Sequence, residues 1–402
     1  MRAQLKTHSE FLMVFVLFVA FRLMMVLLFT PASFLTRGYT DFMYYYDMAA
    51  LSAQGFFPHV HFWFEYPPVF PYLAIAVYQA THAANEGMAY FSRMLALVLL
   101  PFDMSIVINL YRIARRLYDP AVAVRLAWVY AMLLLPIFFW QYSFDTMVAA
   151  LTLQAFYWLL TQHRVASAVM LAVAIATKFS PAFLIGTAWR FAPGWRSAAI
   201  YTGIVIGGVV LIFAPFAMSS PAYTLASFQS LISVSAWDTV WALLDGNINY
   251  GDVGGLPRHF DLALAGVPLH NPSSLPMWGT LIPFAAIFFF ILTRRWERAN
   301  PRHFMIFTGI TLMLFHLWSK GWSPQWITLL LPFILLFYPN WRGVLLAIVF
   351  SFGALLDWPL AFAMASPPLY ILGVFVRTGL FILIGLDLYL EWLNSQRMKR
   401  KN

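Results

Sequence analysis

Long apolar runs separated by short polar stretches make up most of this chain. The first run, from Phe11 to Phe29, has the length that a membrane-crossing helix requires. Other runs that span or nearly span a bilayer lie at 90–111, 123–140, 145–161, 198–217, 278–293, 304–318, 326–338, 343–360 and 369–392. The pattern predicts an all-α, polytopic transmembrane bundle of about 12 membrane segments.

One apolar region, 165–189, is interrupted. It contains the sequence Lys178-Phe179-Ser180-Pro181. Proline lacks a backbone donor and disfavours helix in the residue before it. We therefore expect two short helices that meet near Lys178, in place of one long helix.

Composition supports a membrane protein. Hydrophobic residues make up 62% of the 402 residues and charged residues only 10%, which is too apolar for a soluble domain. The formal net charge of +9 comes from short basic clusters between apolar runs, so no soluble basic domain is left to bind nucleic acid. The chain has no cysteine, which excludes disulfides and thiolate metal sites.

The basic clusters predict the orientation. If the N-terminus is cytoplasmic, most arginine clusters also face the cytoplasm, provided that 68–84, opened by Pro67 and Pro68, lies at the outer surface without crossing. A true span at 68–84 would invert the next clusters. The first apolar run contains Arg22 and lacks a clear cleavage site, so we expect it to be retained.

With a cytoplasmic N-terminus, no span at 68–84 and a retained first run, the sequence predicts one integral membrane domain, 1–402, in the plasma membrane, with both termini cytoplasmic. Two long outer loops follow, 31–89 and 218–277, and the first is expected to carry amphipathic helices. The inner connections are short. Function is therefore expected on the non-cytoplasmic face.

The first outer loop gathers acids among aromatic rings. Asp41, Asp47 and Glu65 lie there, and a carboxylate at a membrane face can take a proton from an acceptor hydroxyl. If the segment is helical, Asp41 and Tyr45 share a face at the i, i+4 spacing. A helix cap for Asp41 and an exposed interfacial position for Glu65 are alternatives that the local sequence leaves open. The catalytic interpretation is weaker for Asp47.

A few cations fall on the predicted outer side. Lys178 lies at the helix break, Lys320 in a short turn between Trp318 and Gln325, and Arg93 at the outer start of a helix. An anionic lipid headgroup would give such cations a partner. Snorkelling of the side chains toward water is the alternative.

Other polar positions have structural explanations. Arg22 and Asp103 fall near the middle of two spans, which favours a buried ion pair over an ion pathway. His59 and His61 are two residues apart, and ordinary hydrogen-bonded or exposed histidines explain them better than a metal pair. Asp145 precedes another apolar run, where it also suits a helix start.

Several segments together resemble a known superfamily. The chain is similar to the GT-C membrane glycosyltransferases, which use polyprenyl- or dolichyl-phosphate-linked sugars, and most resembles their glycosyltransferase family 87 branch of mannosyltransferase-like proteins. The matching segments are YTDFMYY (39–45), GFFP (55–58), EYPP (65–68), QYSFD (141–145), AIATKFSP (174–181), WDTVWALLDG (237–246) and SKGWSPQ (319–325).

The resemblance implies a polyprenyl-phosphate-sugar donor and a glycolipid or glycan acceptor, with the site facing outside. It assigns Asp41 as the catalytic base, whereas the six-residue spacing of Asp47 leaves a second catalytic acid open; Glu65 is a further candidate. No cofactor is implied, and a divalent metal is not required. The candidate substrate-binding residues are Tyr45, Arg93, Asp145, Lys178, Trp237, Asp245, Lys320 and Gln325.

Two other classes compete with an enzyme. A lipid or small-molecule transporter or flippase would place binding groups at broken helices near the midplane and often shows internal repeats. The sequence has no clear repeat, and its acids gather at one face. A non-catalytic lipid-binding scaffold is the third class.

Overall fold

The computed structural model describes residues 8–28, 41–84, 87–233, 235–248, 254–269 and 273–401. Within these ranges the chain is helical and forms no strand; isolated bridges join Pro58 to Phe62 and Trp237 to Gly321. The predicted all-α class is confirmed.

Five of the described helices are long and apolar enough to cross a membrane. They are α2 (Ser9–Leu28), α6 (Met88–Leu117), α12 (Trp195–Ser219), α18 (Trp341–Leu355) with its continuation η6 (Leu356–Ala361), and α19 (Pro367–Lys401). A pair bent by 62°, α7 (Pro120–Met132) and α8 (Leu134–Tyr142), makes a sixth if it is counted as one span. The expected total of about 12 segments stays a prediction.

Shorter helices fill the bundle and one of its ends. They are α4 (Asp41–Ala50), α5 (Val69–His82), α9 (Asp145–Leu160), α10 (Arg164–Ile175), α11 (Leu184–Arg190), α13 (Pro221–Ser233), α14 (Val240–Leu244), α15 (Met277–Leu292), α16 (Pro301–Trp318) and α17 (Ile327–Phe337). Single 3₁₀ turns connect them at η1 (Leu51–Gln54), η2 (Ser180–Phe183), η3 (Leu256–Phe260), η4 (Leu262–Leu264) and η5 (Pro324–Trp326).

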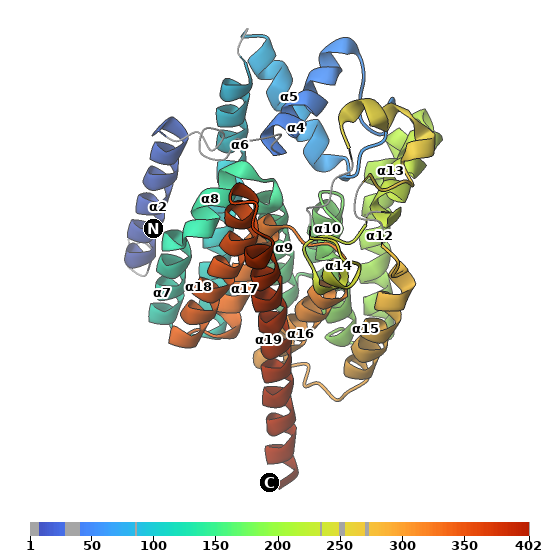
Figure 1. The fold of residues 1–402 in the computed structure, drawn as a ribbon. Helices are drawn as coiled ribbons and strands as arrows, with labels where there is room; N and C mark the ends of the chain where they lie inside the picture. Colours follow the sequence, from blue (N-terminus) through green and yellow to red (C-terminus); the bar gives the residue numbers. More distant parts are fainter. Residues whose placement is uncertain are drawn as a thin grey trace.

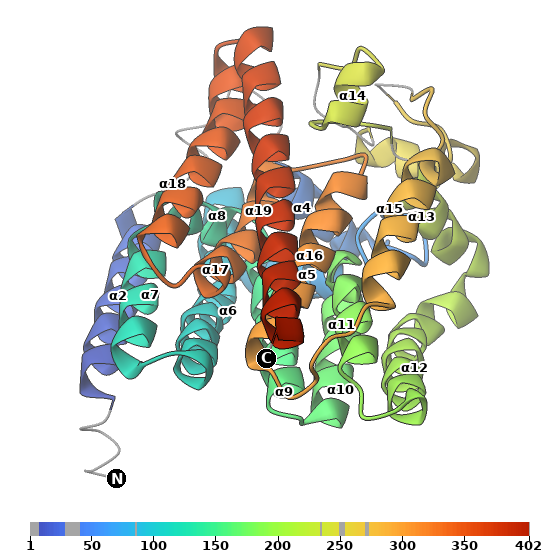
Figure 2. The ribbon, with the colours of Figure 1, turned by 90° about the horizontal axis from the view of Figure 1, so that it is seen from below.

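The core surrounds α17, every residue of which is buried. Its sequence is apolar on all sides, as expected for a helix enclosed by neighbours. Helices α9, α16 and α18 pack around it. Helices α4 and α5 lie at one end of the bundle, and α19 projects beyond the other end (Figure 1; Figure 2 looks along the bundle from that second end).

Two predictions about the spans are confirmed. Arg22 of α2 and Asp103 of α6 are fully buried, and Nε lies 2.8 Å from Oδ2. Tyr130 of α7 donates a further hydrogen bond to Asp103 at 3.1 Å, so this buried charge is shared among three helices. The region around Lys178 forms the two expected short helices, with α10 ending at Ile175 and α11 beginning after η2.

The segment predicted to be the first outer loop carries helices α4 and α5, as expected. Helix α5 packs against α4 and is not among the candidate spans. The second outer loop contacts the first, because the Trp63 ring stacks on His259 with centroids 3.8 Å apart and Trp63 N donates to the His259 carbonyl at 3.0 Å. Residues 31–40, including Tyr39 and Thr40 of the first motif, and residues 249–253 and 270–272 lie outside the described ranges.

Candidate functional site

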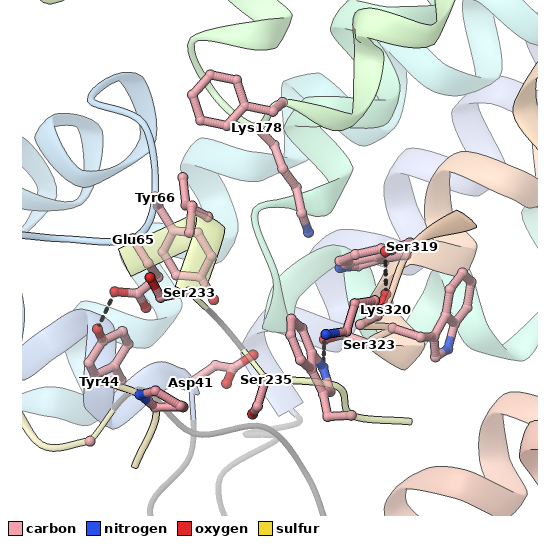
Figure 3. A pocket seen from close by; sticks show the side chains of 18 of the residues that line it. Asp41, Tyr44, Glu65, Tyr66, Lys178, Ser233, Ser235, Ser319, Lys320 and Ser323 are labelled. Carbon is pink, nitrogen blue, oxygen red and sulfur yellow. Dashed lines mark hydrogen bonds between the residues drawn. The ribbon is translucent and has the colours of Figure 1, made fainter. Parts of the chain in front are cut away.

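A cavity of about 1330 Å³ opens at the end of the bundle that carries α4 and α5. Its lining comes from segments that are far apart in the chain. They include α4, the Glu65-Tyr66-Pro67 segment, the turn at Lys178, the end of α13, the segment around Trp237, residues 254–257 and 273–277, and residues 318–326. Figure 3 shows the carboxylate of Asp41 and the ammonium of Lys178 reaching in from opposite walls.

Asp41 is the first residue of α4 and lines the cavity. Gln325 of η5 donates from Nε2 to Asp41 Oδ2 over 3.4 Å. Burial, and then the negative charge of Asp145, raise the pKa of Asp41 to about 6, although Lys178 acts to lower it. A carboxyl group with this pKa is ionised at neutral pH and is a stronger base than an ordinary aspartate.

Lys178 lies on the wall of the cavity opposite Asp41. Its Nζ lies 2.6 Å from Asp145 Oδ1, and it lies over the Trp326 and Phe144 rings at 4.7 and 5.3 Å from their centroids. Ser143 Oγ donates to the other Asp145 oxygen at 2.8 Å. Asp145 is not among the lining residues, so its contribution is to orient the ammonium group that faces the cavity.

The backbone around Lys178 is anchored to the first outer loop. Val69 N, directly after Pro67 and Pro68, donates to the Ala176 carbonyl at 3.2 Å. Prolines restrict the conformation of the segment that makes this contact. The EYPP (65–68) and AIATKFSP (174–181) segments, which are separated by about a quarter of the chain, are thereby fixed next to each other.

Lys320 lies in the turn between α16 and η5 and also lines the cavity. Its Nζ donates to the Leu275 carbonyl, and its own carbonyl accepts from Thr239 Oγ1 at 2.8 Å and from Trp237 N at 3.2 Å. Burial lowers the pKa of Lys320, while Asp245 acts in the opposite direction.

Asp245 does not line the cavity, but it binds residues of a segment that does. It accepts hydrogen bonds from the hydroxyl groups of Ser273 and Ser274, and Ser274 N donates to it at 3.0 Å. Burial acts to raise the pKa of Asp245, but these hydrogen bonds and Lys320 outweigh it, so that the pKa is lowered. The ionised group fixes the segment that carries Ser273 and Leu275, both of which line the cavity.

The remaining acids of the first loop line the same cavity. Asp47 is exposed near its rim. Glu65 is buried and accepts a hydrogen bond from Tyr44 OH at 2.8 Å. Tyr44 also lines the cavity, whereas Tyr45 packs in the core against Tyr66, Phe70 and Phe144.

The structure brings seven of the eleven candidate residues to the cavity wall. Arg93 is exposed on α6 and does not line the cavity, so its proposed contact with substrate remains a prediction. Tyr45, Asp145 and Asp245 lie behind the wall. The seven that line it are Asp41, Asp47, Glu65, Lys178, Trp237, Lys320 and Gln325.

Sequence reasoning missed several lining aromatics. Tyr44, Trp322, Trp326 and Trp358 all line the cavity. Three of the missed positions had a usable signal. Tyr44 lies in the first motif, and Trp322 and Trp326 flank the Ser323-Pro324-Gln325 turn.

The ring of Trp237 packs closely against Gly321. A Cβ atom on Gly321 would lie 2.2 to 2.4 Å from the Trp237 ring. We expect Gly321→Ala to displace this ring and to destabilise the fold by about 1 to 3 kcal/mol, as overpacking does. Thermal unfolding in detergent, followed by tryptophan fluorescence, measures the change.

The matched control is Gly203→Ala on α12, where a Cβ meets nothing within 4 Å. It should leave the unfolding temperature equal to or above that of the wild type, since alanine favours a helix. Equal behaviour of the two variants would show that the Trp237 contact with Gly321 is not a tight one.

Within the described ranges, no three His, Asp or Glu side chains gather as metal ligands. The sequence-based statement that a metal is not required stays a prediction.

No protein-family model and no curated protein matches the chain. Among solved structures, it is similar to the apo oligosaccharyltransferase of Archaeoglobus fulgidus, with a TM-score of 0.48 and 14% sequence identity. The match covers 92% of this chain and 56% of that one, so this chain spans little more than half of its length. The GT-C resemblance continues to rest on the sequence motifs.

Proposed function

We propose that this protein is a membrane glycosyltransferase. It moves a sugar, a hexose such as mannose, from a polyprenyl-phosphate donor to a hydroxyl of a glycolipid or glycan acceptor on the non-cytoplasmic face. The observation that carries the proposal is the placement of a raised-pKa carboxylate, Asp41, across one cavity from the ammonium groups of Lys178 and Lys320.

The reaction is a single displacement at the anomeric carbon. Asp41 accepts the proton of the acceptor hydroxyl, whose oxygen forms the new bond to that carbon. The bond from the carbon to the phosphate oxygen breaks at the same time, and the lipid phosphate leaves with the electron pair. One displacement inverts the configuration and needs no covalent enzyme intermediate.

The cations act on the leaving group. Negative charge grows on the phosphate as its bond to the sugar breaks, and a fixed cation in a site with little water stabilises it strongly. Lys178 is held in place by Asp145, and Lys320 by the Leu275 carbonyl.

The cavity also has an apolar side that suits a polyprenyl chain. Ile232 at the end of α13 and Met277 at the start of α15 both line it, and they are 65% and 41% exposed. The charged centre therefore shares the cavity with exposed apolar side chains. A donor with a phosphate head and a prenyl tail satisfies both regions.

The direct test is transfer by the purified, reconstituted protein. Polyprenyl-phosphate-linked hexoses are supplied with a glycolipid acceptor, and mass spectrometry follows the products. Glycosylated acceptor with inverted linkage and free polyprenyl phosphate are expected. Movement of unchanged substrate across the vesicle membrane without covalent transfer would instead identify a transporter.

The pKa of Asp41 sets the expected pH dependence. Because its pKa is raised to about 6, the carboxyl is mostly protonated below that pH and cannot act as a base. We expect kcat/KM to be constant above about pH 7 and to fall about tenfold per pH unit well below pH 6. The residual rate of Asp41→Asn should show no such fall, and a parallel fall in that variant would assign the titration to another group.

A further inference from the structure

Arginines converge at the end of the bundle opposite the cavity. Arg190 ends α11, while Arg294 and Arg298 lie in the connection from α15 to α16. Figure 2 shows this connection running beside α11. We call Arg190, Arg294 and Arg298 the arginine cluster.

Backbone carbonyl groups hold the cluster together. Arg190 Nη2 donates to the Arg294 carbonyl at 2.8 Å, and Arg298 Nη1 donates to the Pro193 carbonyl at 3.0 Å. These two bonds run in opposite directions between the same two segments, so they fix both guanidinium groups at one junction. The Arg294 guanidinium is stacked 3.7 Å from the centroid of the Phe290 ring.

Within the described part of the chain, no carboxylate forms an ion pair with these three arginines. Among the described residues, the ion pairs at this end of the bundle join Arg302 to Glu391, Arg342 to Asp387 and Lys399 to Glu297. Glu297, although it lies beside Arg298 in sequence, is thus already paired. Burial and the charge of Arg298 both lower the pKa of Arg190, which shows that the two like charges repel each other.

The surroundings of the arginine cluster suit a lipid better than a soluble anion. Trp189 and Trp195, next to the cluster on α11 and α12, are 43% and 72% exposed, and Phe289 and Phe290 on α15 are 59% and 47% exposed. Exposed tryptophans mark the level of lipid headgroups in membrane proteins. Apolar rings beside arginines suit acyl chains beside a phosphate, whereas a soluble anion would gain nothing from them.

We propose that the arginine cluster binds the phosphate of an anionic phospholipid headgroup in the leaflet opposite the catalytic cavity. The guanidinium groups contact the phosphate oxygens as charged hydrogen-bond donors. The acyl chains lie against the exposed rings of α15 and α12. The site is separate from the proposed glycosyl transfer and does not depend on it.

The test measures lipid binding by the full-length protein in detergent, using native mass spectrometry. Phosphatidylglycerol is the probe, and phosphatidylcholine is the neutral comparison. We expect the double variant Arg190→Gln/Arg298→Gln to bind phosphatidylglycerol about 25-fold more weakly, from about fivefold per arginine. Binding of phosphatidylcholine should be unchanged.

The matched control removes two positive charges from the same end of the bundle, at exposed positions outside the cluster. Arg116→Gln/Arg397→Gln should keep wild-type affinity for phosphatidylglycerol. Equal weakening in this control would overturn the site in favour of general charge attraction. If the first double variant does not fold, Arg298→Gln alone, at an exposed residue, should still lose about fivefold.

A competition experiment distinguishes a lipid headgroup from a soluble phosphate compound as the ligand. Glycerol 3-phosphate carries a phosphate without acyl chains and should not displace bound phosphatidylglycerol at millimolar concentration. Displacement would overturn the lipid assignment and identify a site for soluble phosphates. No sugar donor is present in these experiments, so their failure would leave the proposed transfer untouched, and failure of transfer would leave this site untouched.

Discussion

Asp41→Asn is expected to reduce kcat for sugar transfer by about 10²- to 10⁴-fold, the usual contribution of a general base. The amide keeps the size of the side chain and can still accept a hydrogen bond, but it cannot take a proton from the acceptor. Binding of the donor should change little, because the donor phosphate is assigned to the lysines on the far wall. Initial rates with the purified protein and donor binding by fluorescence measure the two effects separately.

Two control variants sharpen this test. Asp119→Asn changes an exposed aspartate outside the cavity, just before α7, and should leave transfer unchanged. Asp47→Asn changes the exposed acid at the cavity rim and should have a smaller effect than Asp41→Asn. If Asp47→Asn abolished transfer and Asp41→Asn did not, the role of base would move to Asp47.

The sequence predicted the elements whose causes are local. Proline disfavours helix in the residue before it, and the break after Ile175, ahead of Pro181, agrees with this rule. Helices α6, α12, α15 and α17 each continue through an internal proline, so the rule indicates a break without requiring one. The charges of Arg22 and Asp103 in the middle of apolar runs required a partner, and few other charges were available. The acids of the first loop and the two lysines were candidates from their charge and position in the chain, whereas the role of Asp41 as base and the candidacy of Trp237 and Gln325 came from the resemblance to a family.

Features that depend on tertiary packing could not be predicted from the sequence. Both Tyr44 and Tyr45 are near Asp41 on a helix, at the i+3 and i+4 positions, and periodicity does not choose between them. In the structure Tyr44 lines the cavity and donates a hydrogen bond to Glu65, while Tyr45 packs against the rings of Phe70 and Phe144. The hydrogen bond that distinguishes Tyr44 from Tyr45 on α4 thus comes from a residue 21 positions away in the chain.

Asp145 illustrates the same limit. It was expected to contact substrate, but its carboxylate is occupied by Lys178 and Ser143 behind the cavity wall. The start of α9 and the turn after α10 must come together for this pair to form, and no local pattern encodes that meeting. Its direct contact with substrate stays an untested prediction, and the structure supports a positioning role.

Lys178→Met is expected to reduce transfer by about 10²- to 10³-fold, comparable to the loss of one preorganised group that stabilises negative charge. Methionine keeps most of the volume and removes the charge that faces the leaving phosphate. The variant should also be less stable by about 3 to 5 kcal/mol, because Asp145 is left as a buried charge without its cation. Loss of activity in this variant alone would therefore have two explanations.

The double variant Lys178→Met/Asp145→Asn separates them. Asparagine removes the uncompensated charge and can keep the hydrogen bond from Ser143, so the unfolding temperature in detergent should return toward that of the wild type. Transfer should remain as slow as in Lys178→Met, since the cation is still missing. Recovery of wild-type transfer in the double variant would show that Lys178 serves only to neutralise Asp145, and the leaving-group role would then rest on Lys320.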